Sequence, residues 1–428
     1  MSDLNLLLFA VGALTLALAL GAGVLRRGVR VVSEPMLATA LGAALGPFGL
    51  DAFRLADWGD PLAIVEQTAR LTVGFAVVAT ALRLPPGYVR RHLRSLAVLL
   101  GPGMLLMWAA SGAAVWAVLD VGVWTAVLLG AVVTPTDPVL AGTTVTGPLA
   151  ERAVPGRVRH LVSVEAGAND GAAYLLVFLP LLVLTRPGGG VAAVWAGHVL
   201  LWEVGAAVAL GYGLGWAIGR AQAALKARGF EETTSTLTAT VALTLVALAG
   251  VRLAGSDGIL AAFAAGVAFD RTADRPEEEE QARVQEVVNR LFAVPAFVVF
   301  GLALPVAEWA ALGWGRLAAL AALVLALRRL PALVALGPLL PALRRRADVA
   351  FVGWFGPVGM AAVFYAALAA HRTGDPTVWA VGSFLVAASV LASGATSTPL
   401  TLAYGRGAGD DRGRGGPPPA ASGGRRGA

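Results

Sequence analysis

Apolar segments long enough to cross a lipid bilayer recur from residue 4 to residue 403, and they limit the fold more than any other feature of the chain. Hydrophobic residues make up 57% of the 428 positions and charged residues only 14%, far less charge than a soluble domain of this length carries. A backbone inside lipid has to satisfy its own hydrogen bonds, so long apolar segments fold as helices. The sequence therefore predicts an all-α polytopic membrane protein.

Thirteen such segments are present, which predicts about 13 transmembrane helices. They lie near residues 4–25, 31–50, 62–84, 94–118, 122–146, 157–185, 190–219, 233–251, 256–270, 286–305, 309–341, 349–370 and 376–403. With the N-terminus outside, twenty Lys and Arg residues fall in the inside loops and four in the outside loops. This positive-inside pattern places the C-terminus in the cytoplasm, and it accounts for the basic residues without a nucleic-acid partner.

The chain divides into one transmembrane domain over residues 1–404 and a Gly/Arg/Pro-rich cytoplasmic tail over residues 405–428. The tail has no apolar run, so we expect it to be disordered. There is no cysteine, which excludes a disulfide framework and thiolate metal sites.

The segment 122–146 contains Thr134-Pro-Thr-Asp-Pro138, in which two prolines bracket Thr136 and Asp137 at membrane depth. A proline at position i removes the helical donor for the carbonyl of residue i−4, so the carbonyls of Ala131 and Thr134 lose their partners. One membrane proline usually produces only a kink, but two predict a broken helix with exposed oxygens. Such breaks line ion sites in secondary transporters.

A second interruption, Gly353-Trp-Phe-Gly-Pro357, lies in the segment 349–370. This segment follows the first broken one by seven spans, so the two cross the bilayer in opposite directions. Inverted repeats have this arrangement, with the two broken helices crossing at a site near the midplane. The predicted break residues are Thr134, Pro135 and Pro138 in the first segment, and Gly356 and Pro357 in the second.

Two carboxylates and a carboxamide, from Glu165, Asn169 and Asp170, lie inside the apolar segment 157–185, where an uncompensated carboxylate costs several kcal/mol. Glu165 and Asn169 are four residues apart and share a helix face, whereas Asp170 lies about 100° round. Arg328 and Arg329, within the segment 309–341, need a buried acceptor. Glu165 is the favoured acceptor, because a permanent arginine partner would keep Asp170 from cycling between a cation and a proton.

A carboxylate beside two broken helices binds a small cation when it is ionised and a proton otherwise. The two ligands then exclude each other. If only the loaded forms cross the membrane barrier, the exchange of cation for proton is obligatory.

Four motifs in order resemble the NhaP-like bacterial sodium/proton antiporters of the monovalent cation:proton antiporter-1 family, over about residues 4–403. They are Thr134-Pro-Thr-Asp-Pro-Val139, the Glu165…Asn169-Asp170 pattern, the arginine before Pro331, and Phe351-Val-Gly-Trp-Phe-Gly-Pro357. The resemblance implies a secondary transporter and not an enzyme, so no catalytic residues and no cofactor are expected. It also implies a homodimer in the bacterial plasma (inner) membrane, in which a core domain moves against a dimerisation domain, and a role in pH homeostasis.

By resemblance, Asp170 is the exchanging carboxylate and holds the monovalent cation, with Asp137 and the backbone around Thr136 contributing to the site. Glu165 and Asn169 are expected to pair with an arginine, aligned to Arg329 with Arg328 as the second choice. The carried ions are Na+ (or Li+ or K+) and H+. A single aspartate preceded by asparagine resembles the electroneutral branch, with one proton per cation.

The chain departs from the family pattern at two positions, because Ala166 stands where a serine is frequent and Val358 where an arginine is usual. Two other functions are compatible with the residues alone. One is a carrier for a small organic solute, and the other is an intramembrane aspartyl enzyme that uses Asp137 and Asp170. The breaks have no enlarged polar or aromatic set for a solute, and the chain lacks a Gly-x-Gly-Asp protease signature.

Overall fold

The computed structural model describes residues 2–28, 33–85, 87–186, 188–229, 235–272 and 291–415, and over these ranges every regular element is a helix. The first elements are α1 (Ser2–Gly28), α2 (Glu34–Leu45), η1 (Leu55–Asp57), α3 (Pro61–Leu82), α4 (Tyr88–Arg91), α5 (Leu93–Val98), η2 (Leu99–Gly103), α6 (Met104–Val118), α7 (Val123–Val132), α8 (Pro138–Val145) and α9 (Gly147–Ala153). They are followed by α10 (Gly156–Thr185), α11 (Val191–Val194), η3 (Trp195–Ala206), α12 (Ala207–Ala227), α13 (Ser235–Leu245), η4 (Val246–Gly250), α14 (Val251–Leu253) and α15 (Gly258–Thr272). The last are a helical stretch at Leu291–Leu302, α17 (Val306–Leu312), α18 (Trp314–Leu327), α19 (Leu330–Leu336), η5 (Gly337–Leu339), α20 (Arg346–Trp354), α21 (Met360–Thr373) and α22 (Pro376–Gly415). The all-α prediction is confirmed.

Within the part of the chain that the structure describes, six continuous helical runs are long and apolar enough to cross a membrane. They are Pro61–Leu82, Leu93–Val118, Gly156–Thr185, Val191–Leu225, Trp314–Leu339 and Pro376–Gly407. A seventh is added if Leu291–Leu302 and Val306–Leu312, which meet at 57°, form one bent span. Within the described residues, helix occupies part of each of the thirteen predicted segments, but several helices are short or broken. The multi-pass architecture is thus established, while the exact number of crossings stays a prediction.

Three helices begin at the same dipeptide, an aspartate followed by a proline: α3 at Asp60-Pro61, α8 at Asp137-Pro138 and α22 at Asp375-Pro376. The carboxylate accepts hydrogen bonds from the first free backbone N–H groups, as Asp375 Oδ1 does from Thr377 N–H at 2.9 Å. Proline is tolerated at the first helical position because that position needs no donor. The local sequence therefore dictates where the second half of the first broken helix starts.

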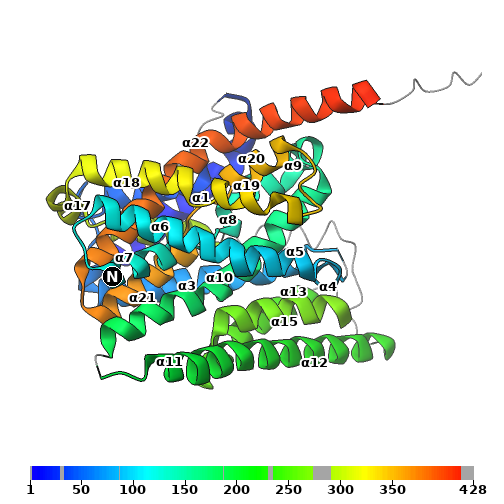
Figure 1. Cartoon of the computed structure of the whole chain (residues 1–428), viewed down its shortest axis with the longest axis horizontal. Coiled ribbons are helices and arrows are strands. Elements are labelled where there is room, and N and C mark those ends of the chain that lie inside the picture. The colour runs from blue at the N-terminus through cyan, green and yellow to red at the C-terminus, as the bar shows by residue number, and fades with distance from the viewer. Residues whose placement is uncertain are drawn as a thin grey trace, which may run out of the picture.

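Close packing of small residues joins α12 to α15. A Cβ atom at Gly211 would collide with the backbone of Ala261, and one at Gly215 would collide with that of Ala265. Glycine at both positions lets the two helix backbones approach. Figure 1 shows this pair along one edge of the bundle, with α3 and α10 beside it and α6 and α18 farther away.

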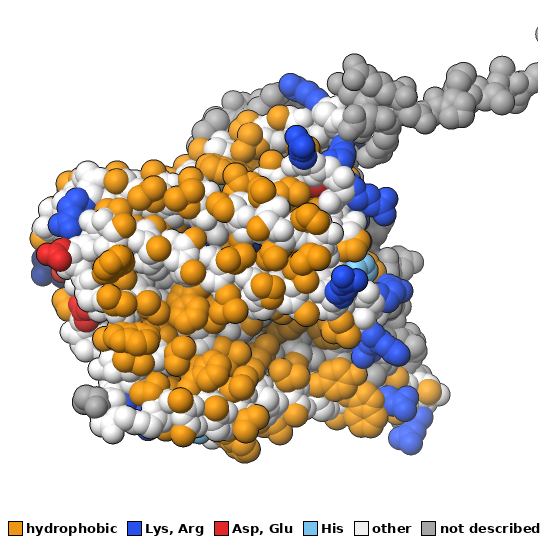
Figure 2. All heavy atoms as spheres, in the orientation of Figure 1, with side chains coloured by type: hydrophobic (Ala, Val, Ile, Leu, Met, Phe, Trp, Pro, Cys, Tyr) orange, Lys and Arg blue, Asp and Glu red, His pale blue; other side chains and the backbone are white. Residues whose placement is uncertain are grey.

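The surface in Figure 2 carries a broad apolar band, drawn in orange, between two charged edges. Most of the visible Lys and Arg side chains lie along one edge, and the visible Asp and Glu side chains lie mainly at the opposite one. A polytopic protein has this pattern when basic residues collect on one side of the bilayer.

The last helix continues past the predicted domain boundary. Residues 405–415 extend α22, whose end projects from the bundle in Figure 1. At Gly405 the helix lies close to α9, because a Cβ atom there would press on Ala153. The division of the chain at residue 404 stays a prediction. Residues 416–428 of the predicted tail lie outside the described residues.

Candidate ion-binding site

The two predicted breaks meet in the structure. The first separates α7, which ends at Val132, from α8, which begins at Pro138. The second separates α20, which ends at Trp354, from α21, which begins at Met360. The Asp137 N–H donates to the Pro357 carbonyl at 2.9 Å and joins the two non-helical segments directly.

The Asp137 carboxylate caps two helices at this junction. Its Oδ1 accepts from Val139 N–H at 2.6 Å and from Leu140 N–H at 3.0 Å, in the first turn of α8. Its Oδ2 accepts from Met360 N–H, at the start of α21. Gly359 makes this approach possible, because a Cβ atom there would overlap the carboxylate. The negative charge thus faces the positive ends of two helices.

Arg328 binds the backbone oxygens that the breaks expose. Its Nη1 donates to Val133 O and Thr134 O, both at 2.8 Å, and its Nη2 donates to Gly356 O on the second break. The carbonyl of Ala131 accepts from Thr134 N–H at 3.1 Å. Both proline-freed carbonyls therefore accept a hydrogen bond, and their exposure to an ion stays a prediction. A buried guanidinium carries five N–H groups, and each of them needs a hydrogen-bond acceptor. The backbone carbonyls of the two breaks supply acceptors for Arg328.

Arg329 makes the ion pair with Glu165. The contact is bidentate, with Nη1 to Oε1 at 2.6 Å and Nη2 to Oε2 at 2.5 Å, and both side chains are buried. The remaining Nε donates to Val352 O on α20 at 2.8 Å. Gly356 leaves room for this side chain, because a Cβ atom there would overlap it. A buried pair with this geometry satisfies both charges.

Asn169 pairs with Thr136, not with an arginine. Its Oδ1 accepts from Thr136 N–H at 3.1 Å, and its Nδ2 donates to Thr136 Oγ1 at 2.8 Å. Sequence spacing places Asn169 on the same helix face as Glu165, and the family resemblance implies that both pair with an arginine. Arg329 is already satisfied by Glu165 and Val352, and the break presents an unpaired N–H and hydroxyl that the amide fits.

Asp170 is the exception among these buried polar groups. Its side chain is 0% exposed, and neither carboxylate oxygen has a hydrogen-bond partner among the described residues. Among the described residues outside α10, a single hydrogen bond reaches Asp170, and it goes to the backbone carbonyl, which accepts from the Tyr365 hydroxyl at 2.6 Å. Ala166, one helical turn earlier, is also buried and offers no oxygen from its side chain.

Two positioning side chains escaped the sequence interpretation. Tyr365 on α21 binds the Asp170 carbonyl, and Ser389 on α22 accepts from Val358 N–H at 2.8 Å within the second break. A hydroxyl inside an apolar helix usually finds a polar partner, so each was detectable as a polar residue in a buried segment. The identity of the partner required the fold.

A cavity of about 160 Å³ opens beside this region. Tyr174, one helical turn beyond Asp170, lines it together with Phe364 of α21. The rest of its wall includes the ionisable side chains of Glu66, Arg70, Arg252 and Asp257. The cavity, which several ionisable side chains line, thus comes to within one helical turn of the unpartnered carboxylate.

Comparison with known proteins identifies the class of fold. A family model described as "Sodium/hydrogen exchanger, transmembrane" matches residues 12–403. Na+/H+ antiporter 2 of Zygosaccharomyces rouxii is 31% identical over 401 residues, which cover 87% of this chain and 50% of that protein. The Na+/H+ antiporter of Saccharomyces cerevisiae is 29% identical over 406 residues, which cover 87% of this chain and 41% of that protein. The structure of the sodium proton antiporter MjNhaP1 from Methanocaldococcus jannaschii at pH 8 aligns with a TM-score of 0.66 at 14% identity, covering 95% of this chain and 98% of that one.

The chain belongs to the sodium/hydrogen exchanger family, as its motifs predicted. It spans about half the length of the two yeast relatives. The similarity to MjNhaP1 shows a shared fold. Because the two sequence relatives are fungal, the expected bacterial origin receives no support from them.

Proposed function

We propose that this protein is a secondary active antiporter that exchanges a monovalent cation for H+ through Asp170. Na+ is the first candidate for the cation, and Li+ and K+ are the alternatives. One observation carries the proposal: in a member of the exchanger family, a fully buried carboxylate lies without any hydrogen-bond partner among the described residues. A bare buried charge is costly, so this is the group that a proton or a cation has to neutralise.

The charges around Asp170 support this assignment. Glu165 and Arg329 neutralise each other. The Asp137 carboxylate and the Arg328 guanidinium each bind backbone groups of the two breaks, and their opposite charges add to zero. Asp170 is thus the one buried carboxylate of this group without a compensating charge. Loaded with either H+ or a monovalent cation, it leaves the group neutral, and one proton replaces one cation.

The mechanism follows from this balance. A loaded, neutral site crosses the apolar barrier at low cost, whereas the empty, charged carboxylate does not. Asn169 and Thr136 fix the first break against α10, and Tyr365 fixes α21 against the Asp170 backbone. The oxygens that complete the cation shell are proposed to come from the region of Thr136 and Asp137.

The location and the assembly are part of the proposal. The positive-inside pattern supports an external N-terminus and a cytoplasmic C-terminus in the plasma membrane. A homodimer, in which a core domain moves against a dimerisation domain, is what the family resemblance implies. The solute carrier and the aspartyl enzyme are not adopted. An acid pair needs two available carboxylates, and the oxygens of Asp137 already accept three backbone N–H groups.

Everted membrane vesicles test the function. Addition of Na+, Li+ or K+ to vesicles that hold a preformed proton gradient should dissipate the gradient, and Asp170→Asn should abolish the response. The matched control is Asp375→Asn, which changes a helix-capping aspartate far along the chain and should exchange normally. Normal exchange by Asp170→Asn would refute the assignment. A rate that depends strongly on an imposed membrane potential would contradict the one-to-one stoichiometry.

A further inference from the structure

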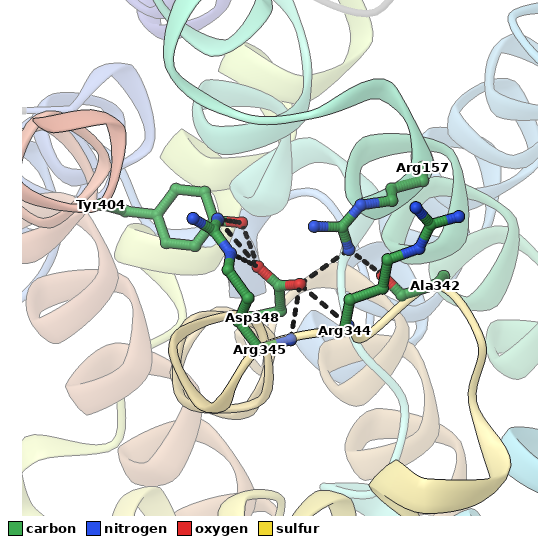
Figure 3. Close-up of polar contacts among 6 residues, drawn as sticks. All are labelled: Arg157, Ala342, Arg344, Arg345, Asp348 and Tyr404. Carbon is green, nitrogen blue, oxygen red and sulfur yellow. Dashed lines mark hydrogen bonds and ion pairs between the residues drawn. The ribbon is translucent and has the colours of Figure 1, made fainter. Parts of the chain in front are cut away.

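A cluster of charged side chains outside the ion-binding site joins α10, α20 and α22 (Figure 3). At its centre lies Asp348, whose side chain is 0% exposed. Arg157 Nη1 on α10 donates to Asp348 Oδ2 at 2.7 Å, and the Tyr404 hydroxyl on α22 donates to Asp348 Oδ1 at 2.5 Å. The Arg345 guanidinium and the backbone N–H groups of Arg344 and Arg345 complete the shell at 2.9–3.2 Å. We call these five residues the Asp348 cluster.

Asp348 and the two adjacent arginines of the cluster lie between the predicted spans 309–341 and 349–370, in one of the basic loops. Burial raises the pKa of Asp348, but hydrogen bonds from Arg157 and Tyr404 outweigh burial and hold the pKa below its ordinary value. A carboxylate with a lowered pKa contributes stability above its unfolded pKa and loses that contribution only as pH falls through the folded pKa. The cluster therefore stays ionised and assembled across the neutral range.

The other end of α20 reaches the ion-binding site. Val352, one turn after Asp348 and about 6 Å along the helix, accepts from Arg329. The next residues form the second break, where Gly356 O accepts from Arg328 and Pro357 O accepts from Asp137 N–H. Because α20 has only nine residues, its anchored start determines where these carbonyls lie.

Helix α10, which contributes Arg157 to the Asp348 cluster, also carries Asp170. Arg157 lies in the first turn of α10, and Asp170 follows thirteen residues later, about 20 Å along the same rigid helix. Arg157 also donates to the Ala342 carbonyl, which ties the loop before α20 to the same point. One carboxylate thus fixes the start of α10 against the start of α20.

We propose that Asp348 is a positioning residue of the exchange reaction, which holds α20 against α10 so that the second break stays in register with Asp170. This inference rests on the proposed function. Loss of the Asp348 charge should let α20 shift and weaken cation binding, while Asp170 itself remains able to exchange.

The test compares Asp348→Asn with wild type in the vesicle assay. A hydrogen-bonded charge is lost, so the cation concentration for half-maximal exchange should rise about three- to tenfold, while the maximal rate per folded protein changes less than about twofold. Tyr404→Phe removes one of the donors to Asp348 and should raise the half-maximal cation concentration by about twofold or less. Asp375→Asn is the matched control, because Asp375 also caps a helix but binds no arginine in the described structure, and it should behave as wild type.

A second readout measures binding without transport. In detergent, the Li+ or Na+ concentration that gives half of the cation-induced rise in melting temperature should increase by the same factor. Fewer folded molecules with an unchanged half-maximal concentration would show a structural role only and overturn the proposal, as would wild-type behaviour. If Asp348→Asn does not fold, Arg157→Lys and Tyr404→Phe carry the same test. Asp170→Asn, run in parallel, distinguishes the two hypotheses: if it still exchanges, the proposed function fails whatever Asp348→Asn does.

Discussion

Asp137 and Asp170 are both buried aspartates, 2% and 0% exposed, yet their surroundings are opposite. Asp137 precedes a helix, where the first backbone N–H groups have no helical acceptor, and it accepts three hydrogen bonds from two helices. Asp170 lies in the middle of α10, where each neighbouring N–H already binds a carbonyl one turn back, and its carboxylate has no donor among the described residues. The position within a helix therefore decides which carboxylate has its charge satisfied by backbone N–H groups and which is left without a donor.

The largest expected effects are at these two aspartates, where substitution of Asp137 should reduce stability and substitution of Asp170 should abolish transport. Asp137→Ala should lower the free energy of unfolding by about 3 kcal/mol or more, because three buried N–H groups lose their acceptor. Asp170→Asn should leave the melting temperature equal to or above that of wild type and abolish exchange. Thermal unfolding in detergent, alongside the vesicle assay, measures both. Destabilisation by Asp170→Asn comparable to that of Asp137→Ala would erase the distinction.

The buried ion pair provides the next largest effect. Glu165→Gln leaves Arg329 charged and unpaired in the interior, which should cost about 3–5 kcal/mol of stability. The double variant Glu165→Gln/Arg329→Gln removes both charges and should be more stable than Glu165→Gln alone. A double-mutant cycle of melting temperatures checks this coupling. Additive losses would mean that the two side chains do not compensate each other.

A smaller effect is expected at Tyr365, which contacts Asp170 only through the backbone. Tyr365→Phe removes one buried hydrogen bond, worth about 0.5–1.5 kcal/mol, and should shift the half-maximal cation concentration by about two- to tenfold. The exchange should still depend on Asp170. A matched control is Tyr212→Phe, which removes an exposed hydroxyl that binds Arg271. Equal shifts in the two variants would remove Tyr365 from the site.

The smallest expected effect sharpens what Asp170 binds. Ala166→Ser places a hydroxyl one turn before Asp170 with little change in volume. It should lower the half-maximal Na+ or Li+ concentration by a few-fold at most, because the added oxygen contributes about as much free energy as one hydrogen bond. Ala173→Ser, also buried on α10, is the control. An unchanged half-maximal concentration would indicate that the serine oxygen does not reach the cation, for instance because it binds the carbonyl one turn back.

Much of the fold was predictable from sequence because lipid permits few alternatives. Apolar length gave the helices, and the Asp-Pro and Gly-Pro motifs gave both breaks to within a residue or two. The rule that buried charges pair indicated an arginine partner for Glu165, and the family resemblance favoured Arg329 over Arg328. The contact of Gly405 with Ala153 of α9 was not predictable, because it joins residues far apart in the chain.

The site was less predictable because its hydrogen bonds join residues far apart in the chain. Several donors compete for the same acceptors. Arg328 donates to the carbonyl of Thr134, which was expected to face an ion. Asn169 binds Thr136, because Arg329 already has acceptors in Glu165 and Val352. Asp348 gave no signal at all, since an aspartate beside three arginines in a loop ordinarily indicates a solvated surface. Tertiary packing alone shows that it is buried.

A single uncompensated carboxyl in the membrane also sets a thermodynamic ceiling on what such a carrier can do. In the proposed one-for-one exchange, each turnover replaces one positive charge by another, so the membrane voltage does no net work on the carrier and only concentration ratios drive it. A pH difference of one unit then supports at most about a tenfold cation gradient, equivalent to roughly 1.4 kcal/mol per ion. A cell that relied on such a carrier alone could expel the cation against its gradient only while its interior was more alkaline than its surroundings, because the entry of H+ drives the exit of the cation.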